Sequence, residues 1–514
     1  MPAMETTMSR RPATRRAPQP AASAAARKPA VTVRHYCQDI GDCHLLSFPR
    51  ADGSPFWMLI DCGIHVSIKG GPALIADIVA DLKAETGGKI DVLVVTHEHW
   101  DHVSGFLTSD DLFKDFSVGE VWMAWTENLG DPEALELDKF KAQALTALQG
   151  ASRRLDAEHG LSTYMSGIRD GLQSVLGFHF GAKGERVRAA RDAAARLSAK
   201  QPPAYFEPSG PPLSIPTLPN LRIYVLGPPR DKAALRLEEK VSEMYPLAAG
   251  GPFTRALSAG LAVNEAGDGT YLDELSPFER SVGTELSSVL NSGAAGYAQG
   301  DIGAFVRTHY SGPVSGAGAN EDPDQSWRSI DADWLAIAAD LALQLDRGVN
   351  NTSLVLAFEF IDTGRVFLFP GDAQIGNWLS WKDLRWPVGE ATVTATDLMA
   401  RTVYLKVAHH GSQNATPQKQ GLELMTSSDL SAFIPTNQLD AKNVHWGEMP
   451  YDAILTALAA RTKGRVIRAD DEWIGNKNGK PAFAPPTGSI LAVRNAPRDA
   501  ARGKGGLWVE LDLA

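Results

Sequence analysis

Residues 91–102 read DVLVVTHEHWDH, a short apolar run that passes directly into ligand-type side chains. Apolar runs of this length are typical of buried strands. Imidazole nitrogens and carboxylate oxygens are the donors that zinc, manganese and iron bind. We therefore expect His97 and His99 to hold one metal ion, and Asp101 and His102 to hold a second. A solvated surface cluster is the alternative, and the crowding of three histidines at a strand end argues against it.

Two later segments also end an apolar strand in polar side chains. Residues 365–369 (RVFLF) lead into Pro-Gly-Asp-Ala and place Asp372 at a strand end, where a carboxylate can bridge two metal ions. An aspartate after glycine is also common in turns. Residues 402–408 (TVYLKVA) lead into His409 and His410. Because adjacent side chains point in different directions, we expect one of this pair to bind metal and the other to contact substrate.

Together, these elements resemble the metallo-β-lactamase fold hydrolase superfamily. Its HxHxDH motif matches residues 97–102, and its bridging aspartate matches Asp372. An earlier element of the superfamily, an acid at a strand end before glycine, matches Asp61 in LIDCG. The resemblance implies an α/β fold, the metallo-β-lactamase αββα sandwich, interrupted here by a large, mainly helical insertion.

Within the superfamily, three strings look most like the hydrolase domain of ComEC-type competence proteins and the phosphorylcholine esterases. The strings are NNTSLVL, FLFPGDA and LKVAHHGS. The resemblance covers about residues 31–125, 220–230 and 346–460. It implies a phosphodiester as the substrate class, in preference to a lactam, a thioester or a lactone.

The resemblance also implies a centre of two divalent metal ions, with Zn²⁺ favoured and Mn²⁺ second. The implied ligands are His97, His99, Asp101, His102, Asp372 and His410. The superfamily usually has a further metal-binding histidine, and this chain has Asn351 near that place, so water or Asn351 would complete the first site. The closing ligand has two candidates. His410 precedes glycine at a strand end and is favoured, whereas His445 follows a strand and a loop, as the closing ligand often does.

The catalytic residues expected from the resemblance are Asp101, His409, His445 and Asp61. Asp61 would stand behind a metal-bound histidine or a bridging water and orient it; a plain turn residue is the alternative. His409 or His445 would contact the substrate or protonate the leaving oxygen. A hydroxide that bridges the metals would be the nucleophile, because metal binding lowers the pKa of water toward about 7.

Changes in composition divide the chain into four parts. Residues 1–30 are rich in Ala, Pro and basic side chains, which predicts a disordered tail; a transit peptide is the alternative, and the lack of an apolar h-region argues against secretion. Residues 31–125 and 346–514 alternate strands with helices and are predicted to form the two parts of the core. Residues 126–345 are rich in Ala and Leu and predict a helical insertion over the metal face, with one core strand at 221–226.

The periodicity of apolar residues places most of the elements. Strands are predicted at 31–36, 44–48, 56–60, 91–96, 221–226, 353–360, 365–369, 402–408, 432–435 and 507–513. Helices are predicted at 72–84, 134–155, 162–176, 185–199 and 330–346. Gly87 and Gly88 should end the first of these helices.

Composition excludes several classes of protein for this chain of 514 residues. Its 50 basic and 61 acidic residues give a net charge of −11, so it lacks the broad basic surface of DNA-coating proteins. The three cysteines form no CxxC pair, which argues against a disulfide scaffold and for a reducing compartment. No run approaches the roughly 18 apolar residues of a membrane span. We therefore expect a cytoplasmic protein without membrane association.

These features favour a metal-dependent phosphodiesterase or nuclease, acting on a phosphodiester-containing small molecule or a nucleic acid. A hydrolase of a small ester, lactone or lactam is the alternative among enzymes. A partner-binding or sensing module with a structural metal site is the alternative outside them, although the sequence names no protein partner. The ligand set argues against the module, because one missing histidine leaves the open position that catalytic sites require.

Overall fold

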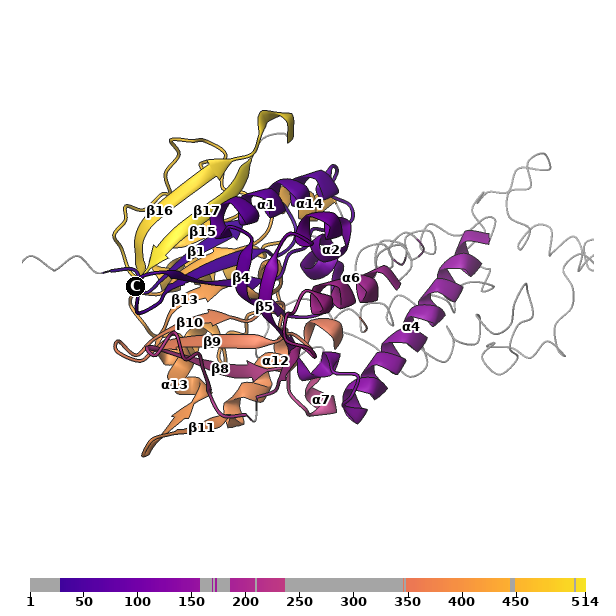
Figure 1. Ribbon diagram of the computed structural model, residues 1–514, viewed down its shortest axis with the longest axis horizontal. Coiled ribbons are helices and arrows are strands. Elements are labelled where there is room, and N and C mark those ends of the chain that lie inside the picture. The colour runs from indigo at the N-terminus through magenta and orange to yellow at the C-terminus, as the bar shows by residue number, and fades with distance from the viewer. Residues whose placement is uncertain are drawn as a thin grey trace, which may run out of the picture.

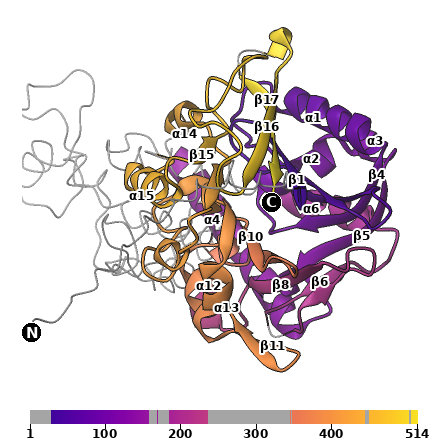
Figure 2. The same ribbon diagram turned by 90° about the vertical axis from the view of Figure 1, so that its left-hand side faces the viewer.

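A computed structural model describes residues 28–157, 169, 172, 185–208, 210–235, 345, 348–443, 449–502 and 505–514. Within these ranges, two β-sheets face each other and helices cover their outer faces (Figures 1 and 2). This αββα layering confirms the fold class predicted from the sequence. Two further strands, β11 (Arg385–Val388) and β12 (Ala391–Thr394), pair only with each other.

The first sheet has eight strands in the order β16-β17-β1-β2-β3-β4-β5-β6. Its strands from β16 to β3 are antiparallel, whereas β3 to β6 run parallel to one another. The bounds are β1 Val31–Tyr36, β2 His44–Pro49, β3 Pro55–Ile60, β4 Lys89–Val95, β5 Ser117–Ala124, β6 Ala204–Phe206, β16 Ile490–Pro497 and β17 Gly506–Leu513. The ligand-type motif therefore begins at the carboxyl end of a parallel strand, β4.

The second sheet has seven strands in the order β15-β14-β13-β10-β9-β8-β7. Strands β10, β13, β14 and β15 are parallel, and the others are antiparallel. The bounds are β7 Leu213–Ser214, β8 Leu221–Gly227, β9 Val355–Phe360, β10 Arg365–Phe369, β13 Thr402–Lys406, β14 Ser431–Ile434 and β15 Val466–Arg468. Because β10 and β13 are parallel neighbours, the segments that follow them emerge at the same edge of the sheet.

Strand β9 shows how the layers are held together. Leu356 and Phe358 belong to the apolar cluster between the two sheets, whereas Val355 and Ala357 belong to the cluster that the outer helices cover. Successive side chains of a strand point to opposite faces, so a strand with four consecutive apolar residues, as at 355–358, must be buried on both. The ring of Phe358 lies 5.7 Å from that of Phe48 in the first sheet. Burial of this apolar surface is the main stabilising contribution.

Helices cover the outer face of each sheet (Figure 2). Those on the first sheet are α1 (Gly71–Thr86), α2 (Trp100–Thr108), α3 (Asp110–Phe113) and α6 (Glu185–Arg196). Those on the second are α12 (Ile375–Ser380), α13 (Ala395–Ala400) and α15 (Asp452–Thr462). The other described α-helices are α4 (Pro132–Ala157), α7 (Lys232–Leu235) and α14 (Gln438–Asn443). Short 3₁₀ turns lie at η1 (Trp125–Glu127), η5 (Trp381–Asp383), η6 (Ala408–Gly411), η7 (Leu422–Leu424) and η8 (Ala500–Arg502).

Helix α1 follows directly from its sequence. Its side chains at a spacing of three and four residues are buried against the sheet: Leu74, Ile75, Ile78, Val79 and Leu82. The helix ends at Gly87, whose φ of 64° lies in the left-handed region. Glycine adopts this conformation without steric penalty, which makes it the usual residue at a helix C-terminus.

Most of the predicted elements are found. The strand predicted inside the insertion is β8, and the helices predicted at 134–155 and 185–199 are α4 and α6. The helices predicted at 162–176 and 330–346 lie almost wholly outside the described residues, as does the tail up to residue 27. The domain boundaries and the position of the insertion as a whole stay predictions. No helix in the described ranges has the length and apolar character to cross a membrane.

Candidate metal centre

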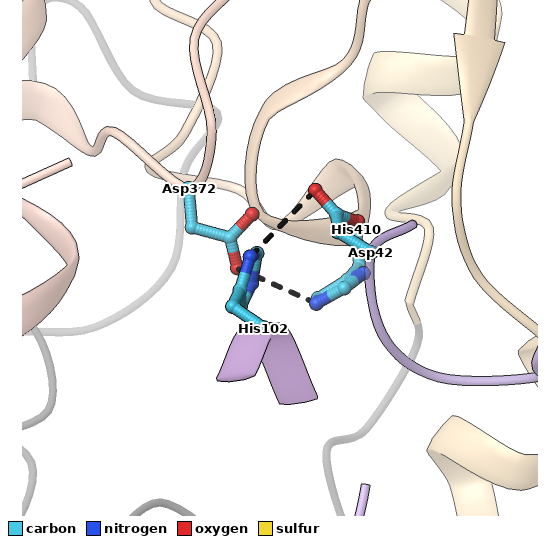
Figure 3. Close-up of side chains that lie close together, drawn as sticks. All are labelled: Asp42, His102, Asp372 and His410. Carbon is cyan, nitrogen blue, oxygen red and sulfur yellow. Dashed lines mark hydrogen bonds and ion pairs between the residues drawn. The ribbon is translucent and has the colours of Figure 1, made fainter. Parts of the chain in front are cut away.

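Four buried side chains from four separate segments converge at one edge of the two sheets (Figure 3). They are Asp42, His102, Asp372 and His410, and their ligand-type atoms all lie within 4.8 Å of one another. Asp42 precedes β2, His102 is in the first turn of α2, Asp372 follows β10, and His410 follows β13. Three of these residues were predicted as ligands, and Asp42 was not.

His102 lies between two carboxylates. Its Nδ1 is 2.8 Å from Oδ2 of Asp61, and its Nε2 is 3.0 Å from Oδ2 of Asp372. Burial alone would lower the pKa of His102, but the surrounding carboxylates, Asp372 foremost, raise it well above its ordinary value. This site therefore attracts positive charge, whether a proton or a metal ion.

The two oxygens of Asp372 have different partners. Oδ1 accepts hydrogen bonds from the backbone N–H of His409 at 3.1 Å and from the ammonium group of Lys406 at 3.2 Å. Oδ2 lies 3.0 Å from Nε2 of His102 and 3.4 Å from Nε2 of His410. Burial would favour the neutral acid, yet His102 and Lys406 hold the pKa of Asp372 well below its ordinary value. Oδ2 is thus an ionised oxygen between two imidazole nitrogens, the position expected of a bridging ligand.

The turn after β13 aims His410 at the site. Its φ is 55°, a left-handed conformation that the tight turn imposes. Nδ1 lies 2.6 Å from the carbonyl oxygen of Pro435, so Nδ1 carries a hydrogen and donates it. Nε2 lies 3.0 Å from Oδ2 of Asp101, and although burial lowers the pKa of His410, Asp372 and Asp101 raise it above its ordinary value, so Nε2 also carries a hydrogen and donates it here. Loss of that proton would leave the tautomer with a lone pair on Nε2. This tautomer suits metal binding through Nε2.

His97 and His99 are buried beside this group. Nε2 of His97 lies 3.0 Å from Nδ1 of His99, and the His97 ring centroid lies 4.2 Å from that of His102. Burial, reinforced by the neighbouring His102 and His99, holds the pKa of His97 well below its ordinary value. His97 is therefore neutral, as a metal-binding imidazole must be.

Asp61 is placed behind His102. Its Oδ1 accepts a hydrogen bond from the backbone N–H of Thr96 at 2.8 Å, and its Oδ2 accepts one from the Thr96 hydroxyl at 2.6 Å. The same Oδ2 is the partner of His102 Nδ1. This arrangement fixes the ring and directs Nε2 toward Asp372, as a carboxylate behind a ligating histidine does. A catalytic contribution of Asp61 stays a prediction.

The ring of His409 lies among neutral polar side chains. Its Nδ1 lies 2.7 Å from the Ser412 hydroxyl and 3.1 Å from Nε2 of Gln374, and its Nε2 lies 3.3 Å from Nδ2 of Asn350. His409 is 9% exposed, more than any of the predicted ligands. His410 thus belongs to the group of four and His409 contacts the neighbouring polar side chains, while the division of the pair into metal ligand and substrate contact stays a prediction.

Asn351, which with water was a candidate to complete the first site, is hydrogen-bonded to two neighbouring segments. Its Oδ1 accepts a hydrogen bond from the backbone N–H of Asn377 at 3.0 Å, and its Nδ2 donates to the carbonyl oxygen of Leu235 at 3.3 Å. These contacts tie α12 to α7, whereas Asn350 is the amide that approaches His409. His445, the other candidate for the closing ligand, lies outside the described residues.

Sequence reasoning missed Lys406, which is 1% exposed. Its ammonium group forms ion pairs with Asp42 and Asp372 and donates to the carbonyl oxygen of Gly371 at 2.9 Å. Burial would lower the pKa of Lys406, but these two carboxylates raise it above its ordinary value, so the group is a cation. The position of this lysine at the end of an apolar strand, just before two histidines, was a signal in the sequence, but it does not name the carboxylates that the lysine contacts.

Glu98 lies between two predicted ligands but contacts the insertion. Its carboxylate lies 2.6 Å from the ammonium group of Lys141 in α4 and 2.8 Å from the guanidinium of Arg191 in α6. Burial would raise the pKa of Glu98, but Lys141 and Arg191 lower it to about 2. Helix α6 also packs against α2 (Figure 1). The described part of the insertion is thus joined to the loop that carries His97 and His99.

A comparison with protein families finds a match in the part of the chain that carries the HxHxDH motif. Residues 52–127 match the metallo-beta-lactamase superfamily. The matched segment runs from β3 through the HxHxDH motif to the end of η1, and it includes Asp61 but not Asp372 or His410. No curated protein matches the chain.

The family match and the geometry of the four side chains both indicate a metal-binding site. Metallo-β-lactamase proteins are generally metal-dependent hydrolases, and the buried His/Asp group presents the nitrogen and oxygen donors that divalent zinc or manganese accepts. The residues present therefore fit a divalent metal. The finer resemblance, to ComEC-type domains and phosphorylcholine esterases within the superfamily, is not confirmed by the comparison.

Proposed function

We propose that this protein is a metal-dependent hydrolase that cleaves a phosphodiester, in a small molecule or a nucleic acid. One observation gives the main support for a metal centre: the ionised Oδ2 of Asp372 lies between Nε2 of His102 and Nε2 of His410. His97, His99 and Asp101 complete the expected ligand set around it. Bound divalent metals would lower the pKa of a water molecule enough for it to act as a nucleophile at neutral pH.

The polar side chains around His409 favour an anionic, oxygen-rich substrate. Asn350, Gln374 and Ser412 all contact the His409 ring, and Asn414 donates to Oε1 of Gln374 at 3.0 Å. Neutral donors of this kind can bind phosphate oxygens without repelling the metal ions. A hydrophobic pocket for a lactam or a lactone would require apolar side chains in these positions.

His409 is the residue best placed to assist the departing group. Its backbone N–H holds Asp372, so its ring stays at a fixed distance from the centre. Its partial exposure lets a substrate reach it, and an imidazole in this position can donate a proton to the leaving oxygen. We propose this role for His409, and propose Asp61 as the residue that orients His102.

Metal content and substrate preference can be tested on the same preparation. Elemental analysis of protein expressed with added metal should find about one to two equivalents of Zn or Mn per chain; less than about 0.2 would refute the ligand assignment. Bis-p-nitrophenyl phosphate, single-stranded DNA and nitrocefin should then be compared side by side. The variant Asp372→Ala, purified identically, controls for contaminating nucleases.

The outcomes separate the competing hypotheses. Turnover of the phosphate diester or of DNA by the native chain, and not by Asp372→Ala, supports the proposal. Turnover of nitrocefin alone would favour a lactam or small-ester hydrolase. A full complement of metal without turnover of any of the three would favour a binding or sensing module with a structural metal.

A further inference from the structure

Lys406 places a permanent positive charge where metal ligands converge. Its ammonium group contacts two of the four carboxylate and imidazole side chains that gather within 4.8 Å, namely Asp42 and Asp372. A buried lysine is rare unless it is paired, and here both of its ionic partners have the chemistry of metal ligands. The lysine therefore competes with any metal ion for these two carboxylates.

Asp42 is held in this position by its backbone. Its N–H donates to the carbonyl oxygen of Asp101 at 3.0 Å, and its own carbonyl oxygen accepts from the N–H of Gly63 at 3.0 Å. The fit at Gly63 is so close that a Cβ there would lie 2.2 Å from the carbonyl carbon of Asp101. Asp42 therefore cannot retreat from the site, and its charge must be neutralised where it is.

The other contacts of Asp42 are weak. Nε2 of His44 lies 3.5 Å from Oδ2 and Nδ1 of His102 lies 3.9 Å from it, while Oδ1 has no hydrogen-bond partner among the residues that the structure describes. Lys406 thus supplies most of the positive charge that balances the carboxylate of Asp42. Without the ammonium group, Asp42 would be a buried anion facing His102, ready to bind a metal ion.

We propose that Lys406 is a positioning residue that withholds Asp42 and Oδ1 of Asp372 from the metal centre. Only Oδ2 of Asp372 then faces His102 and His410, and one coordination position stays open for water or substrate, as catalysis requires. The inference rests on the metal centre of the proposed function. It goes further in assigning a role to two residues outside the expected ligand set.

The test uses the full chain loaded with Co²⁺, whose visible absorption weakens as its coordination number rises above four. In Lys406→Met, Asp42 should become an additional ligand. We expect the absorption to fall, and Co²⁺ to resist a competing chelator about tenfold more strongly than in the native chain. In Lys406→Met/Asp42→Asn, which removes both charges of the pair, absorption and affinity should return toward the native values.

Asp42→Asn alone is the second arm, and circular dichroism of the metal-free proteins checks folding. Because Asp42 is not a ligand in the native chain, this variant should keep the native Co²⁺ spectrum and stoichiometry. Loss of metal from Asp42→Asn would overturn the proposal, as would a native spectrum and affinity in folded Lys406→Met. If Lys406→Met does not fold, the Asp42→Asn result decides.

The experiment also separates this inference from the proposed function. A native chain that binds no Co²⁺ overturns both. A native chain that binds Co²⁺ and responds to the substitutions as expected, but cleaves no phosphodiester, overturns only the substrate assignment. A native chain that cleaves a phosphodiester while Lys406→Met leaves the Co²⁺ spectrum and affinity unchanged overturns only the role of Lys406.

Discussion

Two buried groups of charges include residues of the HxHxDH motif, and they differ in their balance of acidic and basic side chains. The centre cluster has four carboxylates around His102, those of Asp42, Asp61, Asp101 and Asp372, against the single ammonium group of Lys406. The insertion cluster pairs the carboxylates of Glu98 and Glu127 with Lys141 and Arg191. One group therefore has an excess of negative charge, and the other is neutral.

The difference separates a site that needs an external cation from one that does not. Buried carboxylates in excess must be neutralised by protons on histidines or by metal ions. Paired acids and bases satisfy each other, and their role is to hold the insertion helices against the motif. We infer that substitutions in the centre cluster should act on metal content and activity, and that those in the insertion cluster should act on stability.

The largest effect is expected from Asp372→Ala. Its Oδ2 is the oxygen that faces both His102 and His410, so its removal would take a ligand from both ions of the proposed centre. Metal content and hydrolysis should be lost together, which elemental analysis and the diester assay can follow. Retention of both metals by this variant would show that the excess charge does not serve metal binding.

His409→Ala should separate chemistry from metal binding. Its ring is within hydrogen-bonding distance of Ser412, Gln374 and Asn350, which lie outside the proposed ligand set. We expect turnover to fall about 10²- to 10⁴-fold while metal content holds. If His409→Ala releases the metal and His410→Ala does not, the roles of the adjacent histidines are reversed.

Arg191→Met should test whether the insertion cluster contributes to stability. It leaves Glu98 and Glu127 with one cation between them, and breaking a buried pair in this way typically destabilises a protein by about 3–5 kcal/mol. Urea unfolding measures the change. Lys200→Met is the matched control. The ion pair of Lys200 with Glu120, 2.9 Å long, is largely exposed to solvent, so it should contribute less than about 1 kcal/mol to the free energy of unfolding. Equal losses in the two variants would contradict the distinction between the clusters.

His410→Ala should weaken metal binding without removing it. The remaining ligands can still hold an ion, so we expect a loss of about 10- to 100-fold in affinity for the second metal. Excess metal in the assay should restore part of the activity. An unchanged affinity would shift the role of closing ligand to His445.

The smallest expected effect is a pH dependence of the metal-free protein. The pKa values of His102 and His410 are raised by the nearby carboxylates against the effect of burial. Above the unfolded value of about 6.5, the folded chain holds protons that the unfolded chain has lost, so stability should fall as the pH rises from about 7 to 8. His97, whose pKa is lowered, is neutral in both states over this range and adds nothing.

Urea midpoints at several pH values can follow this slope, and bound metal should abolish it by replacing the protons. Lys200→Met should keep the slope, because its partner Glu120 is a largely exposed carboxylate whose pKa is lowered and which does not titrate in this range. A flat profile for the metal-free native chain would mean that the histidines do not neutralise the centre cluster.

The sequence by itself determined the αββα class and much of the candidate site. Residues 97–102 are adjacent to a strand, so their convergence is a local property that a short motif can encode. Helix α1 and strand β9 follow from local apolar spacing. Strand β16 was missed because most of its residues are only partly buried at the edge of its sheet, and its apolar residues do not alternate.

The tertiary structure alone decided which atoms meet. The contact of His102 with Asp372 spans 270 residues of sequence, and that of His410 with Asp101 spans 309. Such contacts depend on the parallel pairing of β10 with β13 and on the packing of two sheets, which no local pattern specifies. Lys406 and Asp42 were missed for the same reason. Each is an ordinary polar residue beside an apolar strand, and only the fold removes both from water and places them together.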